Sequence, residues 1–180
     1  MNVVMSKFFI RKASYKDVDA VEKIYSRIHD EEECGNNITG WVRNVYPVRN
    51  VAEKAVERDD LYILEADGEI VGSAIINNIQ GDDYSKGKWV YEAMDNEVCV
   101  LHTLVISPDA AGMGYGKAFV KFYENIAKEN GCIELRMDTN EKNVAVRSLY
   151  KKLGFKEIGI LPVIFNGIPD ISMVLLEKHI

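Results

Sequence analysis

The sequence has few cysteines and histidines, and neither residue type occurs at the spacing of a metal site or a disulfide framework. The three cysteines are Cys34, Cys99 and Cys132, without a C-x-x-C pair, and no histidine stands at metal-ligand spacing. We therefore expect no structural disulfide and no bound metal. Cys99 and Cys132 lie within apolar runs, which is typical of small buried residues and not of nucleophiles.

Long apolar segments and an excess of positive charge are missing as well. No run reaches the roughly 18 apolar residues of a membrane-spanning helix, and residues 1–9 lack the apolar core of a signal peptide. The chain has 22 lysines and arginines against 28 aspartates and glutamates, a net charge of −6. Because nucleic-acid-binding proteins usually carry a basic face, these absences predict a cytoplasmic protein that binds neither membranes nor nucleic acid.

Residues that build a core are plentiful. Hydrophobic residues make up 47% of the chain and charged residues 28%, which is the profile of a soluble globular protein. A length of 180 residues suffices for one domain with a sizeable core. The sequence shows no linker, repeat or low-complexity segment, so we predict a single domain over residues 1–180.

Apolar periodicity predicts a mixed α/β order of elements. Helical spacing predicts a helix that starts after Ser14, a second that ends near Arg58, a third that runs to Asn130 and a fourth over residues 143–153. Strands are predicted over residues 8–10, 61–66, 70–76, 97–106, 132–139, 155–160 and 171–176. We expect a tight turn at Asp67-Gly68, a long polar loop over residues 77–96, and a loop over residues 162–170.

The segment "SPDAAGMGYGKAFV", residues 107–120, carries glycines at three alternate positions. Gly112, Gly114 and Gly116 follow a predicted strand and lead into a predicted helix. A strand-to-helix turn presents backbone N–H groups and a positive helix end to an anion, and glycines let a phosphate approach the backbone. We therefore expect the N–H groups of residues 112–117 to bind a phosphate group.

Spacing separates the nucleotide-binding motifs that use such a turn. A dinucleotide fingerprint, G-x-G-x-x-G, would need a third glycine where the chain has Lys117. A P-loop, G-x-x-x-x-G-K-[ST], would need glycine at Ala111 and a hydroxyl at Ala118. Both motifs are excluded.

The segment does resemble the acyl-CoA signature of the GNAT acyltransferase superfamily, Arg/Gln-x-x-Gly-x-Gly, with Gly114 and Gly116 as its two glycines. Upstream, "LHTLVISP" is similar to the splayed central strand of that family. Downstream, "DTNEKNVAVRSLYKKLGFKEIG" is similar to its second motif, in register at Asn143, Ala145, Tyr150, Gly154 and Phe155. The resemblance is close over residues 97–160 and extends to element order alone over residues 8–76. The Arg or Gln of the motif falls on Ala111, which lacks that side chain but keeps its backbone N–H.

The resemblance implies an α/β GNAT acyltransferase fold. Its central sheet is mixed, mostly antiparallel and twisted, with six to seven strands flanked by about four helices and splayed between the fourth and fifth strands. It also implies acetyl-CoA, or another acyl-CoA, as co-substrate. The residues expected at that co-substrate are Leu104, Val105, Ile106, Gly112, Met113, Gly114, Tyr115, Gly116, Lys117, Asn143 and Tyr150.

Acyl transfer to an amine requires that the amine lose a proton. A lysine-like amine has a pKa of about 10.4, so only about one molecule in 10³ is nucleophilic at pH 7. The reaction needs a proton acceptor, a donor to the carbonyl oxygen and an acid for the departing thiolate. The resemblance assigns the carbonyl contact to a backbone N–H around residues 104–105 and the acid to Tyr150. Tyr150 also suits a core position, and Asn143 suits a plain helix N-cap.

The proton acceptor is less well defined by the sequence. Histone-type members of the superfamily carry a glutamate whose position falls on Val100. His102 has the same strand parity and could accept a proton directly or through water, in the pH 6–7 range of imidazole. A packed core histidine explains His102 equally well. Glu97 is a weaker candidate.

Three aromatic residues lie in the two loops expected to flank the acceptor channel. Trp41, Tyr46 and Trp89 are candidate substrate contacts, with core packing as the alternative. We expect an N-acetyltransferase that acts on a primary amine of a small molecule or peptide by direct attack in a ternary complex, and a homodimer is compatible with this reading. A non-catalytic acyl-CoA-binding module and a protein-modifying acetyltransferase that works through a partner are the alternatives.

Overall fold

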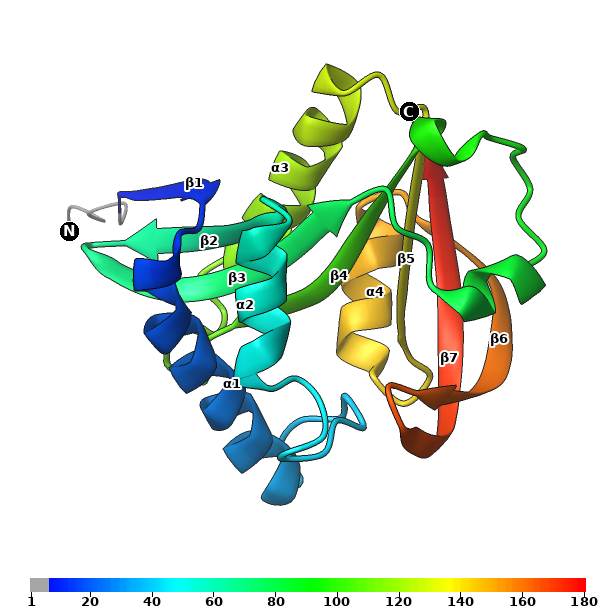
Figure 1. Cartoon of the computed structure of the whole chain (residues 1–180). Helices are drawn as coiled ribbons and strands as arrows, with labels where there is room; N and C mark the ends of the chain where they lie inside the picture. The colour runs from blue at the N-terminus through cyan, green and yellow to red at the C-terminus, as the bar shows by residue number, and fades with distance from the viewer. Residues whose placement is uncertain (1–6) are drawn as a thin grey trace, which may run out of the picture.

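The computed structural model describes residues 7–180 as one seven-stranded sheet with helices on both faces (Figure 1). Residues 1–6 lie outside the described residues. They belong to the predicted domain and to the segment 1–9, for which the sequence predicts no signal peptide. The strand order is β1-β2-β3-β4-β5-β7-β6. Neighbouring strands are antiparallel except β4 and β5, which are parallel. The mixed, mostly antiparallel sheet predicted from the sequence is confirmed.

The elements lie close to the predicted positions. The helices are α1 (Val18–Glu33), α2 (Arg49–Glu57), α3 (Tyr115–Glu129) and α4 (Val144–Lys152). The strands are β1 (Phe8–Lys12), β2 (Leu61–Ala66), β3 (Glu69–Asn77), β4 (Val98–Ile106), β5 (Glu134–Asn140), β6 (Lys156–Phe165) and β7 (Ile168–His179). Among these residues, no helix is both long enough and apolar enough to cross a membrane.

The predicted loop over residues 162–170 is wrong. β6 continues to Phe165 and β7 begins at Ile168, with a two-residue turn at Asn166-Gly167. Both turn residues have positive φ, 48° and 85°, as a tight hairpin requires. Pro162 suggested a break, but β6 is an edge strand, where a missing N–H is tolerated.

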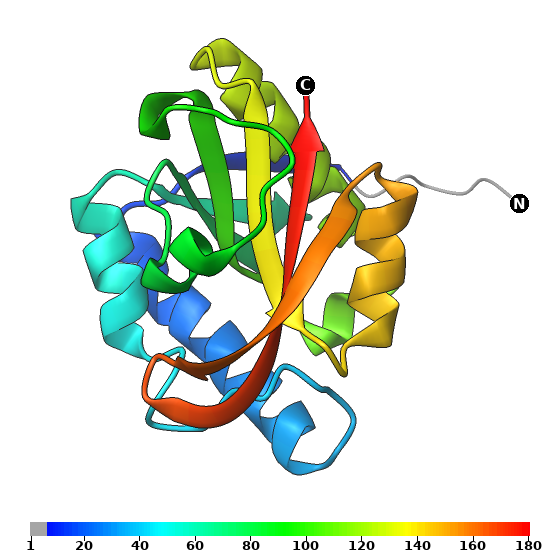
Figure 2. The same cartoon turned by 90° about the vertical axis from the view of Figure 1, so that its right-hand side faces the viewer.

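The helices cover opposite faces of the sheet. α3 and α4 pack on one face around the fully buried Phe119 and Tyr123. α1 and α2 pack on the other face around Val21 and Ala55. Figure 2 shows α2 (cyan) and α4 (orange) on either side of the sheet. The segment between β3 and β4 covers the α1/α2 face of β4, β5 and β7, where Tyr84 is buried.

The parallel strands separate partway along their length. β4 and β5 pair from Val98 and Glu134 to Leu101 and Met137, and the described pairing stops there. Beyond that point β4 stays paired with β3, and β5 with β7. The predicted splay between the fourth and fifth strands is therefore present, and it opens the sheet between its two helical layers.

Candidate active site

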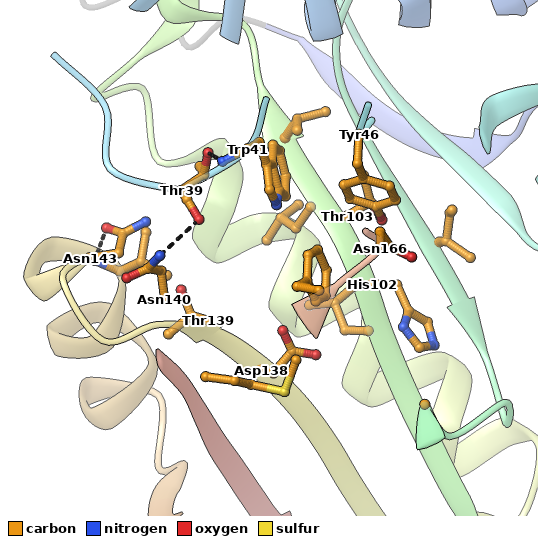
Figure 3. Close-up of a pocket in the computed structure, with 18 of the residues that line it drawn as sticks. Thr39, Trp41, Tyr46, His102, Thr103, Asp138, Thr139, Asn140, Asn143 and Asn166 are labelled. Carbon is orange, nitrogen blue, oxygen red and sulfur yellow. Dashed lines mark hydrogen bonds between the residues drawn. The ribbon is translucent and has the colours of Figure 1, made fainter. Parts of the chain in front are cut away.

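A cavity of about 740 Å³ lies at the splay and reaches both faces of the sheet. On the α3/α4 side it is lined by Gly116, Asn143, Val146, Leu149 and Tyr150. On the α1/α2 side it is lined by Ile28, Trp41, Tyr46, Val51 and Phe165. Its volume is in the range of small-molecule sites. Residues of both helical layers thus line one cavity between β4 and β5 (Figure 3).

A bulge in β4 shapes one wall of the cavity. Ala74 of β3 faces two residues of β4, Thr103 and Leu104, and the register shifts there. Thr103 has a φ of 47°, a strained conformation for a β-branched residue. Its hydroxyl is hydrogen-bonded to the Tyr46 hydroxyl. Because a bulge disrupts the ladder locally, and β5 has already diverged, the backbone of β4 can present polar groups to the cavity.

The glycine loop has the geometry of an anion-binding turn. Gly112 and Gly114 have φ values of 78° and 83°, which favour glycine. A Cβ atom at either position would meet no heavy atom within 4 Å, so the space in front of the loop is open to a ligand. The first hydrogen bond of α3 runs from the Ala118 N–H to the Gly114 carbonyl. The N–H groups of Gly116 and Lys117 therefore have no acceptor within the helix.

The expected acyl-CoA residues fall into two adjoining groups. Leu104–Ile106, Gly116, Asn143 and Tyr150 line the cavity. Gly112, Met113, Gly114 and Lys117 lie on the exposed surface at the start of α3. The Tyr115 side chain is buried and contacts the Phe8 ring, so at this loop Tyr115 can offer its backbone alone. The glycine loop and the cavity thus meet at Gly116.

The Ala111 N–H, which stands where the family motif has Arg or Gln, donates to the Pro108 carbonyl at 3.1 Å within a short 3-10 turn. The anion-binding N–H groups are thus expected from Gly112 onward.

α4 contributes two candidate residues to the cavity. The Asn143 side-chain oxygen accepts the Val146 N–H at 3.3 Å, so Asn143 caps the helix and also lines the cavity (Figure 3). Tyr150 lies two turns further on and is 6% exposed. Burial, and then the charge of Asp138, raises the Tyr150 pKa well above its usual value. Its hydroxyl therefore keeps its proton at neutral pH.

His102 lines the cavity but is a weak base. Its Nε2 lies 3.1 Å from the side-chain oxygen of Asn77, which also accepts the Ile79 N–H. Nε2 therefore donates to Asn77. Burial lowers the His102 pKa to about 4. The expected titration of His102 in the pH 6–7 range is not supported by this environment.

Glu97 stands apart from the residues that line the cavity. Its carboxylate accepts the Met94 N–H at 2.9 Å and closes a short turn before β4. The weaker candidate for the proton acceptor is therefore a local capping residue.

Of the three loop aromatics, Trp41 and Tyr46 line the cavity and Trp89 does not. Trp41, Tyr46 and Phe165 form a chain of edge-to-face contacts, with ring centroids 5.7 Å and 5.3 Å apart, and all three line the cavity. Trp89 lies elsewhere. The Arg136 guanidinium stacks 4.1 Å from the centre of the Trp89 ring, and the indole N–H of Trp89 donates to the Tyr84 carbonyl at 2.8 Å. Trp89 thus packs against a buried arginine, which is the alternative that the sequence left open.

Sequence reasoning missed Asp138. It follows Met137, the last residue of β5 that pairs with β4, and it lines the cavity. The Tyr84 hydroxyl donates to its carboxylate at 2.7 Å. Burial raises the Asp138 pKa to about 6. In the sequence it occupies a polar position of an alternating strand, which normally faces solvent, so no local signal distinguishes it.

Comparison with known proteins identifies the family. Residues 21–155 match the Acetyltransferase (GNAT) family. An uncharacterised N-acetyltransferase of Methanocaldococcus jannaschii is 25% identical over 173 residues, which cover 94% of this chain and 91% of the relative. The thialysine N-epsilon-acetyltransferase of Sus scrofa is 26% identical over 165 residues, which cover 86% of this chain and 87% of the relative.

Solved structures share the fold. A GNAT-family acetyltransferase of Streptococcus agalactiae superposes with a TM-score of 0.80 at 20% identity, over 96% of this chain and 95% of that one. An acetyltransferase of Salmonella typhimurium, solved with its cofactor acetyl-CoA, has a TM-score of 0.70 at 16% identity, over 97% of this chain and 94% of that one. Because the family match spans about three quarters of the chain, and the splayed sheet and glycine loop agree with it, the chain belongs to the acetyltransferase (GNAT) family and is an N-acetyltransferase.

Proposed function

We propose that the protein transfers an acetyl group from acetyl-CoA to a primary amine of a small molecule or peptide, by direct attack in a ternary complex. The observation that carries this proposal is the cavity between β4 and β5, which is lined by residues of both helical layers. An acyl donor on the α3/α4 side and an amine on the α1/α2 side can react there without a covalent enzyme intermediate. Holding both in one cavity removes the entropy cost of a bimolecular encounter.

The α3/α4 side suits acetyl-CoA. The open cradle at Gly112 and Gly114 and the start of α3 would bind the pyrophosphate through backbone N–H groups. Asn143 would lie along the pantetheine arm, because it lines the cavity between that loop and Tyr150. The Salmonella typhimurium neighbour, solved with acetyl-CoA, supports this choice of donor.

The residues around the splay suit acyl transfer. A backbone N–H of β4 near Leu104–Val105 would donate to the thioester carbonyl oxygen, which gains negative charge as the amine attacks. Tyr150 would donate its proton to the departing thiolate, because burial keeps its hydroxyl protonated at neutral pH. Trp41 and Tyr46 would contact the acceptor from the α1/α2 side.

The test is turnover of the purified protein with acetyl-CoA and a panel of primary amines. The panel contains thialysine, cadaverine, kanamycin and a lysine-containing peptide, and free thiol is monitored. We expect thiol release that depends on at least one amine and yields the N-acetylated product. Tight binding of CoA by calorimetry without thiol release with any amine would contradict the proposal and identify an acyl-CoA-binding module.

A further inference from the structure

We propose that Asp138 binds the ammonium group of the acceptor and accepts the proton that the amine loses as it attacks. This inference rests on the proposed function, and it assigns the proton acceptor that the sequence left undefined. Five observations support it: the place of Asp138 in the sheet, the absence of a cationic partner, the strength of the candidate bases, the balance of protons and the character of the cavity wall.

Asp138 lies where the two ligands would meet. β5 leaves β4 after Met137, so Asp138 is the first residue of β5 beyond the paired segment. Figure 3 shows its carboxylate projecting from β5 toward the middle of the cavity. Burial is the larger cause of the raised pKa of both Tyr46 and Tyr150, and in each case the charge of Asp138 adds to it. Asp138 therefore acts electrostatically on a residue of each half of the cavity.

The Asp138 carboxylate is held in place but is not neutralised. Tyr84 donates to it at 2.7 Å, and Tyr84 is fixed in turn by the Trp89 N–H on its carbonyl. Within residues 7–180, no lysine or arginine forms an ion pair with Asp138. A buried carboxylate without a cationic partner is costly. An ammonium ion that enters the cavity supplies the missing partner.

Asp138 is the stronger base of the two candidates in the cavity. Burial raises its pKa to about 6, which the Tyr84 hydrogen bond opposes and the charge of Asp83 increases. Burial lowers the His102 pKa to about 4. Asp138 is thus the stronger base of the two, and its pKa lies closer to that of an amine than the pKa of a free carboxyl group does. Tyr84 and Asp83 are the titratable groups that act on Asp138, and the charge of Asp138 acts in turn on Tyr46 and Tyr150.

The protons balance with Asp138 as acceptor. The nitrogen enters as R–NH3+ and leaves as an amide N–H, so it loses two protons. One passes to the Asp138 carboxylate, which later releases it to solvent. The nitrogen lone pair bonds to the thioester carbonyl carbon, the C–S bond breaks, and its electron pair leaves with sulfur. Tyr150 gives its proton to sulfur and regains the second proton of the nitrogen.

The surrounding cavity wall favours a cationic acceptor. The rings of Trp41, Tyr46 and Phe165 line it, and aromatic faces attract ammonium ions. Asp82 and Asp83 also line it. In the described lining the one arginine, Arg58, is already paired with Asp60 at 2.7 Å. The acceptor class that fits is a primary alkylammonium compound without a carboxylate close to the reacting nitrogen.

The experiment compares wild type with Asp138→Asn, using thialysine, cadaverine and kanamycin as acceptors. Asparagine keeps the shape of the side chain and can still accept the Tyr84 hydrogen bond. For the most active amine we expect kcat/KM to fall about 10²- to 10⁴-fold, with the Kd for CoA unchanged. Asp170→Asn is the matched control, since Asp170 is exposed on β7 outside the cavity lining, and it should keep wild-type turnover.

The pH profile separates a proton acceptor from a structural residue. Wild-type kcat/KM should rise with pH around pH 6, as Asp138 ionises. This limb should disappear in Asp138→Asn and move to higher pH in Tyr84→Phe, because the Tyr84 hydrogen bond lowers the Asp138 pKa. The same limb should persist in His102→Gln.

The outcomes separate this inference from the proposed function. If wild type turns over an amine and Asp138→Asn stays within about threefold of it, Asp138 is not the acceptor and the proposed function stands. Loss of the limb in His102→Gln instead would move the role to His102. If wild type releases no thiol with any of these amines, both proposals fail together.

Discussion

At the scale of single residues, burial sets the acid–base character of the cavity. It lowers the His102 pKa to about 4, raises the Asp138 pKa to about 6, and keeps the Tyr150 hydroxyl protonated. At neutral pH the site therefore holds an ionised carboxylate, a neutral imidazole and a neutral phenol. A base and an acid of different strength in one cavity are what amine acetylation requires.

Replacement of Tyr150 by phenylalanine tests the acid directly. The ring and its contact with Phe155 remain, so the melting temperature should stay close to that of wild type. CoA affinity should change little, and kcat should fall about 10²- to 10⁴-fold, because the thiolate loses its proton donor. Steady-state turnover and a thermal melt measure these effects. If chemistry limits the rate and the variant stays within about twofold of wild type, water supplies the proton.

The same burial makes Asp138 costly for stability. Its pKa rises from 3.8 in the unfolded chain to about 6 in the fold, so the folded state binds the proton more tightly. The cost of burying the carboxylate is absent below about pH 4 and complete above about pH 6, where it reaches about 3 kcal/mol. Asp138→Asn should thus be more stable than wild type at pH 7.5, and the difference should vanish near pH 4. Urea unfolding at the two pH values measures it, and equal stability at pH 7.5 would show that the carboxylate is well solvated.

At the scale of secondary structure, a helix start and a strand bulge both border the cavity at the splay, at Gly116 and Thr103. The Gly114 cap opens α3 with its backbone in the left-handed region. The bulge at Thr103 shifts the register of β4 against β3, and the Tyr46 hydroxyl is hydrogen-bonded to the Thr103 hydroxyl. Both elements offer backbone groups, so side-chain substitutions nearby act through shape and charge.

Two substitutions at Gly114 separate these effects. Gly114→Gln introduces a side chain where φ is 83° and into the space a phosphate would occupy, so it should weaken CoA binding. Gly114→Glu has nearly the same shape and adds a negative charge at the positive end of α3, so it should bind at least about 10-fold more weakly than wild type. The difference in CoA affinity between the two variants should become smaller in high salt, because salt screens the added charge. Calorimetry with CoA measures all three proteins, and an undiminished affinity in Gly114→Glu would exclude this loop as the pyrophosphate site.

At the scale of the whole molecule, both helical layers line the cavity. α3 and α4 build the wall that we propose for the acyl donor, and α1, α2 and the β6–β7 turn build the wall that we propose for the acceptor. The three cysteines are absent from the described lining of the cavity: Cys34 is exposed, and Cys99 and Cys132 are buried. This arrangement favours direct transfer between two bound substrates.

Initial rates should therefore show a sequential mechanism. When acetyl-CoA is varied at several fixed concentrations of an active amine, double-reciprocal lines should intersect, because both substrates must be bound before the acetyl group moves. Parallel lines would indicate an acetylated enzyme intermediate and would contradict direct attack.

The sequence alone determined the elements, the glycine loop and the family resemblance. These depend on neighbours along the chain: helical and alternating periodicity, turn residues such as Asp67-Gly68, and the spacing of Gly114, Gly116, Asn143 and Tyr150. Side chains that line opposite walls of a pocket carry no such local pattern. The sequence therefore predicted the splayed sheet and the helix that carries Tyr150, but it left the proton acceptor open.

Only the tertiary structure decided which polar residues enter the cavity and how they titrate. The Tyr84–Asp138 hydrogen bond joins residues 54 positions apart, and the Tyr46–Thr103 bond joins residues 57 apart. Folding likewise brought Arg136 over the Trp89 ring and buried His102. A side-chain pKa depends on the desolvation and charge that distant segments create around it, so the environments of Asp138, His102 and Trp89 follow from the packed sheet and not from their place in the chain.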